Sequence, residues 1–94
     1  MRRMDGVTEK YYLFGNLVAE RNYKDGRLDG VTKIYYSEKR IKSKWNFKDG
    51  QRDGLAQQYD EEGNLVSEEN YVNGKKVLRK QYDAKGNVVS EQKF

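Results

Sequence analysis

The sequence contains no cysteine, no histidine and no proline among its 94 residues. Without cysteine or histidine, the chain can form no disulfide, thiolate nucleophile, Cys/His zinc site or Ser-His-Asp triad. This excludes most hydrolase and transition-metal chemistry. We therefore expect a protein that is not an enzyme and that has no catalytic residue, metal site or cofactor.

Large apolar residues are also scarce, because Leu, Ile, Val and Phe make up only 19 of the 94 residues. Such a composition approaches that of disordered chains, but a net charge of only +4 and 13% aromatic residues favour order. No apolar run has the roughly 20 residues of a membrane helix. No hydrophobic stretch follows Arg2-Arg3, so we expect no signal peptide and a cytoplasmic protein.

An internal repeat of 24 residues organises the chain. Asp-Gly opens three units, at Asp5-Gly6, Asp29-Gly30 and Asp53-Gly54. A tyrosine, an aliphatic residue and a second aromatic residue then recur, as Tyr11, Tyr35, Tyr59 and Tyr82, as Leu17, Ile41, Leu65 and Val88, and as Tyr23, Phe47, Tyr71 and Phe94. The sequence predicts one repeat domain, 1–94, with units 5–28, 29–52, 53–76 and 77–94.

Each unit has the alternation of two short strands. In 17–23, residues 17, 19 and 23 share one face by the two-residue period of a strand. Asp25-Gly26 and Asp49-Gly50 are strong signals for hairpin turns between units. We therefore expect an all-β fold, an elongated single-layer antiparallel meander of seven or eight strands. One face should be aromatic and aliphatic, and the other charged.

These features carry a resemblance to a known repeat. Tyr11-Tyr12, Gly15-Asn16-Leu17 and Glu20 resemble the consensus of the MORN-variant repeat found in bacterial antitoxin-like and immunity-like proteins. The resemblance covers Asp5 to Phe94. It implies an elongated sheet of hairpins without catalytic residues, which acts as a binding scaffold for proteins or lipids.

Charge is concentrated in the second unit. Residues 29–52 carry seven basic and three acidic side chains, whereas 53–76 carry two basic and six acidic ones. Lys39, Arg40, Lys42 and Lys44 gather around one hairpin and predict a patch for an acidic partner. The alternative is a solvated strand whose charges pair across the sheet, with Glu61, Glu62, Glu68 or Glu69 as the partners.

Trp45 is the most distinctive single residue. Its counterparts in the other units are polar, yet it lies in phase with the predicted apolar face; they are Arg21, Glu69 and Gln92. Tryptophan is enriched among the residues that dominate binding energy, so we expect Trp45 to bind a partner together with the rings of Tyr35 and Phe47. The alternative is that Trp45 caps the ring row formed by Phe47 and its neighbours.

Other patterns have simpler explanations. Turn chemistry accounts for the carboxylates of 60–62 and for the Asp-Gly-x-x-Asp-Gly segment of 25–30, which lacks the further oxygen ligands of a calcium loop. Rings interleave with lysines, as on a platform for single-stranded nucleic acid. The acidic third unit interrupts any basic track, and this disfavours nucleic acid as the partner.

The sequence therefore predicts a non-enzymatic scaffold that binds a partner protein, and the resemblance implies a toxin as that partner. The alternatives are association with anionic phospholipid head groups through the basic hairpin, and a structural spacer or fragment of a longer array. We also expect a homodimer, formed through the aromatic face or an open sheet edge.

Overall fold

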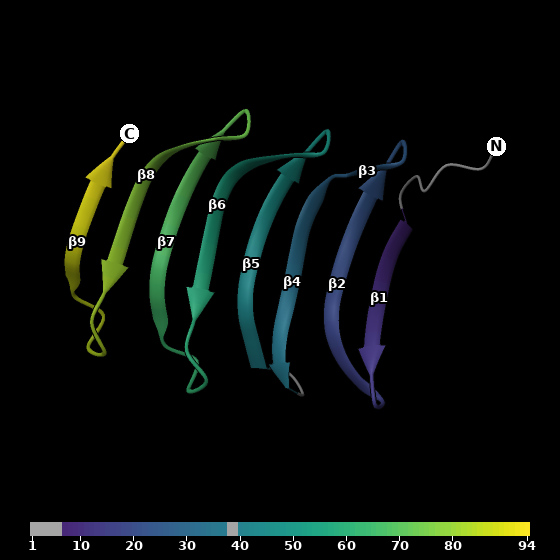
Figure 1. Cartoon of the computed structure of the whole chain (residues 1–94), viewed down its shortest axis with the longest axis horizontal. Coiled ribbons are helices and arrows are strands. Elements are labelled where there is room, and N and C mark those ends of the chain that lie inside the picture. The colour runs from purple at the N-terminus through teal and green to yellow at the C-terminus, as the bar shows by residue number, and fades with distance from the viewer. Residues whose placement is uncertain (1–6, 38–39) are drawn as a thin grey trace.

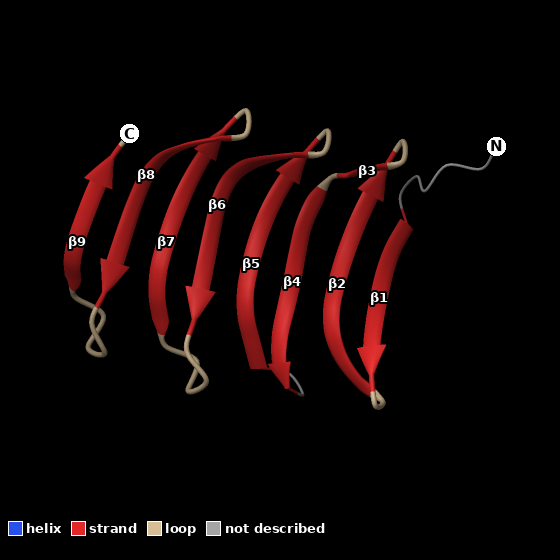
Figure 2. Cartoon of the chain, in the orientation of Figure 1, coloured by secondary structure: helices blue, strands red, loops and turns tan. Residues whose placement is uncertain are grey.

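The computed structural model describes residues 7–37 and 40–94 as one open β-sheet (Figure 1). Its extents of 48 × 34 × 13 Å are those of a single layer. The described residues form strands and loops only (Figure 2), so none of them belongs to a helix that could cross a membrane. The strands are β1 (Val7–Leu13), β2 (Asn16–Lys24), β3 (Arg27–Leu28), β4 (Gly30–Ser37), β5 (Arg40–Lys48), β6 (Gln51–Tyr59), β7 (Leu65–Val72), β8 (Lys75–Tyr82) and β9 (Val88–Lys93).

The strands follow the meander that the sequence predicts. Their order in the sheet is β1-β2-β4-β5-β6-β7-β8-β9, and every paired neighbour is antiparallel. The short β3 pairs with β2 beside this path, which brings the number of strands in the described chain to nine. The predicted all-β, single-layer fold is confirmed.

The turns between units are tight hairpin turns. Asp25-Gly26, Asp49-Gly50 and Asn73-Gly74 all have positive φ at both residues, as a two-residue turn matched to the sheet twist requires. The repeated aspartates hold these turns together across units. Asp29 Oδ2 accepts a hydrogen bond from Asp49 N (3.3 Å), and Asp53 Oδ1 accepts one from Asn73 N (3.4 Å). Asp29-Gly30 and Asp53-Gly54 therefore each anchor the inter-unit turn of their own unit.

At the opposite ends of the strands, the hairpin tips that the structure describes are of two kinds. In the first unit, Phe14-Gly15 forms a two-residue turn between the paired residues Leu13 and Asn16. In the third unit, Asp60 Oδ1 accepts hydrogen bonds from Asn64 N (2.9 Å) and Glu62 N (3.0 Å). Asp83 is bound in the same way in the fourth unit. These bonds, those from the Asn64 and Asn87 backbone amides above all, lower the pKa of both carboxyls.

Protonation of Asp60 and Asp83 is expected to destabilise the protein at acid pH. Their pKa is lower in the folded than in the unfolded chain, so their contribution is complete above the unfolded value of about 3.9 and is lost as the pH falls through the folded value. The Asp60→Asn/Asp83→Asn variant should lose less thermal stability than the wild type between about pH 5 and pH 2. Glu61→Gln, which removes a neighbouring carboxylate, is the control. Identical melting profiles for the double variant and the wild type would contradict the prediction.

Two glycines permit close packing within the sheet. Gly30 and Gly54 both have φ +94°, and the side chains that lie over them belong to Asn22 and Asn46. The space over each of these glycines is therefore filled by an asparagine. The asparagines occupy it because their amides reach a backbone carbonyl beyond the glycine; Asn46 Nδ2 donates to Leu55 O at 2.8 Å.

Gly54→Ala is expected to lower the free energy of unfolding by about 1–3 kcal/mol, because an L-residue is strained at this φ. Urea denaturation followed by circular dichroism measures the change. Lys48→Ala, at an exposed position of β5, is the control and should change stability by less than about 0.5 kcal/mol. A Gly54→Ala variant as stable as this control would refute the assignment.

The aromatic residues lie on both faces of the sheet, which corrects the prediction of one aromatic and one charged face. Paired residues share a face, and a β-bulge separates the pair Ile34↔Ser43 from Tyr35↔Ile41. The bulge moves Ile41 to the face opposite Ser43. The same irregularity recurs at the tyrosine of each unit; in the first unit Tyr12, not Tyr11, lies opposite Leu17.

We name the two faces after a central residue of each. The Trp45 face carries Trp45, Phe47 and Tyr71, and the Tyr59 face carries Tyr59, Tyr82 and the charged row that includes Lys44 and Glu68. All the buried residues of the described chain lie on the Trp45 face: Ala19, Thr32, Ser43, Ala56, Ser67, Glu69 and Tyr71. The core is thus a row of small side chains under large ones.

Candidate functional site

Stacked rings and cations dominate the centre of the Trp45 face. The ring centroids of Trp45 and Tyr71 lie 6.3 Å apart with the planes tilted by 50°. Arg52 places its guanidinium carbon 4.4 Å from the Trp45 centroid and 5.5 Å from that of Tyr71. β5, β6 and β7 each supply one of these residues, so the sheet register holds the group together.

A charged pair extends this group toward β8. Lys76 Nζ lies 2.5 Å from Glu69 Oε2, and this bond raises the pKa of Lys76. The same ammonium lies 6.0 Å from the Tyr71 ring centroid and 5.6 Å from that of Phe94. We call Trp45, Arg52, Glu69, Tyr71 and Lys76 the Trp45 cluster. Its one acid is paired, so the free charge is the Arg52 guanidinium beside the half-buried indole.

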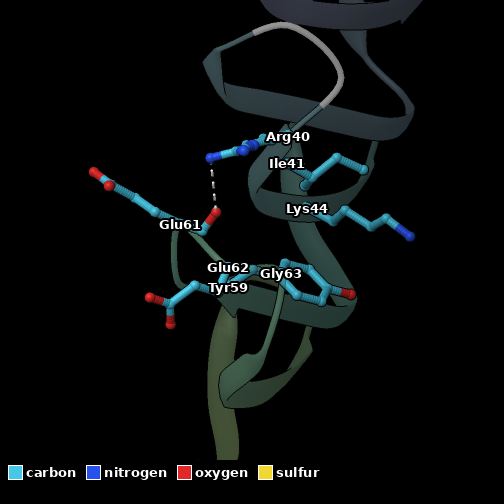
Figure 3. A pocket seen from close by; sticks show the side chains of 7 residues that line it. All are labelled: Arg40, Ile41, Lys44, Tyr59, Glu61, Glu62 and Gly63. Carbon is cyan, nitrogen blue, oxygen red and sulfur yellow. Dashed lines mark hydrogen bonds between the residues drawn. The ribbon is translucent and has the colours of Figure 1, made fainter.

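A groove of about 580 Å³ opens on the Tyr59 face, and we call it the middle groove. Arg40, Ile41 and Lys44 of β5 line one wall, and Tyr59 with the loop 61–63 lines the other (Figure 3). Arg40 Nη1 donates a hydrogen bond to Glu61 O at 3.4 Å. In Figure 3 the Glu61 and Glu62 carboxylates project to the side away from the Lys44 ammonium. The groove combines cations with an apolar wall.

The structure divides the predicted binding residues between two surfaces. Trp45 and Phe47 lie together on the Trp45 face. Lys42 is on that face too, because it lines a hollow with the paired residues Ser43 and Gln58, and its ammonium lies 5.6 Å from the Tyr36 ring centroid. Arg40 and Lys44 line the middle groove. Tyr35 lies on the Tyr59 face one unit earlier, and Lys39 lies outside the described residues.

The basic hairpin therefore does not form one patch. Within residues 7–37 and 40–94, the ion pairs are Arg21–Glu9 and Lys76–Glu69, and neither involves the hairpin cations. Arg40 binds a carbonyl oxygen rather than a carboxylate. The alternative in which these charges pair across the sheet does not describe this part of the chain.

Phe14 is an exposed residue that the sequence reasoning missed. Its side chain is 95% exposed, and its φ of +50° is unusual for a phenylalanine. The signal was available, because the residues before the Gly-Asn of later units are Glu62 and Lys85. Phe14 thus replaces charged counterparts at a loop tip, as Trp45 replaces polar counterparts on a strand.

Comparisons with known proteins agree with the repeat. A family model described as the MORN repeat variant matches residues 4–25, 28–49 and 52–73, at the predicted period. No curated protein matches the chain by sequence. A chain in the crystal structure of accessory secretory protein 1, 2 and 3 in Streptococcus pneumoniae is similar over 92% of this chain, with a TM-score of 0.58 and 17% identity. This chain spans 17% of that one, and the likeness shows the fold alone.

Proposed function

Because the chain belongs to the MORN repeat variant family, we propose that it is a non-enzymatic repeat scaffold that binds a partner protein through the Trp45 cluster. The observation that carries this proposal is the position of Trp45. The only tryptophan of the chain replaces the polar counterparts Arg21, Glu69 and Gln92, and it stays half-buried beside Arg52. Tryptophan, tyrosine and arginine are the residue types that dominate protein interfaces.

The two-sided arrangement of the cations favours a protein over a membrane surface. A flat anionic bilayer can contact only one face of a single-layer sheet, and Lys42 lies on the face opposite Lys44. The exposed acids Glu61 and Glu62 border the middle groove and would be repelled by anionic lipid. The comparisons do not extend to the antitoxin or immunity type, so the proposal names no toxin.

Affinity capture from the source cells, followed by mass spectrometry, tests the proposal. Trp45→Gln places in the second unit the residue that the fourth unit carries as Gln92, so it should fold. Gln92→Ala, at the exposed counterpart, is the control. We expect to capture a protein that also binds the chain when both are purified. Trp45→Gln should abolish this capture, and Gln92→Ala should not. Binding only to vesicles that contain phosphatidylserine, with no protein retained, would refute the proposal.

A further inference from the structure

The middle groove belongs to a series that the repeat builds on the Tyr59 face. The aliphatic residue of one unit and the tyrosine of the next line each groove. Ile41 and Tyr59 form the middle groove, and Leu65 and Tyr82 form the equivalent groove one unit later, which we call the last groove. The loops that follow the two tyrosines have equivalent hydrogen bonds, made by Asp60 and by Asp83, so the side chains that line the grooves can be compared position by position.

The tyrosine of the last groove is bound to a glutamate. Tyr82 Oη donates a hydrogen bond to Glu68 Oε1 at 2.7 Å, and this bond raises the pKa of Tyr82. Tyr35 in the second unit has a similar neighbour, since its pKa is raised by burial and then by the charge of Glu20. In both units a glutamate of the neighbouring strand accompanies the groove tyrosine, and it is paired with the residue two positions before that tyrosine.

The middle groove has no such tyrosine–glutamate bond, because Lys44 stands where Glu20, Glu68 and Glu91 stand in the other units. An ammonium cannot accept the tyrosine proton, and Tyr59 Oη donates instead to Gln57 Oε1 of its own strand at 3.2 Å. The middle groove measures about 580 Å³ and the last groove about 250 Å³. The replacement of a glutamate by Lys44 therefore coincides with a groove that is larger and that carries a cation.

The charges around the middle groove suit a single anionic group. Lys33 lies directly opposite Lys44 in the strand register, and Glu20 lies opposite Lys33 on its other side, so Lys44 faces a like charge and has no acid of its own. Gln57, on the other side of Lys44, carries no charge that could compensate. A carboxylate beside the Lys44 ammonium would supply the missing opposite charge, while Ile41 and the Tyr59 ring offer apolar contact.

We propose that the middle groove binds a glutamate or aspartate side chain, with an adjacent apolar residue, from an acidic segment of the partner protein. The inference rests on the proposed function in taking a protein as the partner. It concerns the opposite face from the Trp45 cluster, so the two surfaces can be tested separately. Glu61 and Glu62 at the rim favour one inserted carboxylate over a surface that carries many anions.

The test is an NMR titration of the 94-residue chain at low salt. The probe is a capped synthetic peptide with a leucine between two glutamates, and its glutamine analogue is the matched control. We expect the glutamate peptide to shift the amide signals of Arg40, Ile41, Lys44 and Tyr59. Lys44→Glu should weaken this binding by about tenfold or more.

Two controls keep the outcome interpretable. Lys44→Glu restores the residue type of the other units, and circular dichroism verifies its fold. Lys42→Glu makes the same charge change on the same strand but on the opposite face, so it should leave peptide affinity unchanged. An absence of shifts, equal affinity in Lys44→Glu, or an equal loss in Lys42→Glu would overturn the proposal.

A lipid ligand would give a different pattern. Vesicles of phosphatidylcholine with phosphatidylserine that bind in a Lys44-dependent way, while the peptide does not bind, would overturn the proposal in favour of a head group. The experiments also distinguish a wrong proposal for the middle groove from a wrong proposal for the Trp45 cluster. A partner capture that depends on Trp45, with no peptide binding, refutes the groove alone, whereas peptide binding with no such capture refutes the Trp45 cluster alone.

Discussion

Replacing Tyr71 by alanine should lower the free energy of unfolding by about 3–4 kcal/mol, a large share of the stability of a small domain. Tyr71 is the one large side chain among the buried residues of the described chain, and it packs against Trp45, Arg52 and Lys76. A single-layer sheet has no second layer that could collapse into the vacated space. Urea denaturation, followed by far-ultraviolet circular dichroism, measures the loss.

Two further variants distinguish the contribution of the Tyr71 ring from that of its hydroxyl and from the loss of an exposed tyrosine elsewhere. Tyr71→Phe keeps the ring and should cost less than about 1 kcal/mol, because the hydroxyl makes only a 3.5 Å contact with Arg52 and Phe47 occupies the same position one unit earlier. Tyr11→Ala removes a tyrosine that is 56% exposed and should cost about 0.5 kcal/mol or less. Equal losses in Tyr71→Ala and Tyr11→Ala would contradict a core on the Trp45 face.

Trp45→Gln is expected to weaken the affinity for the captured partner by about 2 kcal/mol, or about 30-fold. The reason is that a half-buried indole held against Arg52 is already ordered before binding, so its contact area costs little conformational entropy. Isothermal titration calorimetry with the purified partner measures the change.

The Trp45 variant needs a stability control, since Trp45 also contacts Tyr71. Its free energy of unfolding should be measured beside that of Tyr71→Phe, and both proteins must be fully folded in the titration. A folded Trp45→Gln protein that binds the partner as tightly as the wild type would show that the indole only caps the ring row.

The repeat made the fold predictable, but not the faces of its sheet. Period, alternation and Asp-Gly turns all pointed to one antiparallel meander, and each of these signals is local. The β-bulge beside Tyr35 adds one residue to β5 and reverses which side Ile41 faces. A two-residue period cannot reveal this reversal. For this reason Tyr35, Tyr59 and Tyr82 were expected on the same face as the other aromatic residues, whereas they lie on the opposite face.

The residues of the candidate site could also be predicted from the sequence, but their contacts could not. The replacement of a glutamate by Lys44 and of polar residues by Trp45 could be read by aligning the units. The separation of Lys42 from Lys44 depends on the bulge, and the closing bond from Tyr82 to Glu68 depends on cross-strand register. The predicted meander makes β7 and β8 neighbours, but the sequence does not show the register that decides which of their residues meet.

The indole N–H signal of Trp45 gives the most direct test of the proposed scaffold. The chain has one tryptophan, so an ¹H–¹⁵N spectrum contains a single such signal. On addition of the purified partner, we predict that this signal shifts together with the amide signals of Arg52 and Tyr71. A partner that binds without moving the indole signal, and that perturbs only β1 or β9, would contradict the central claim.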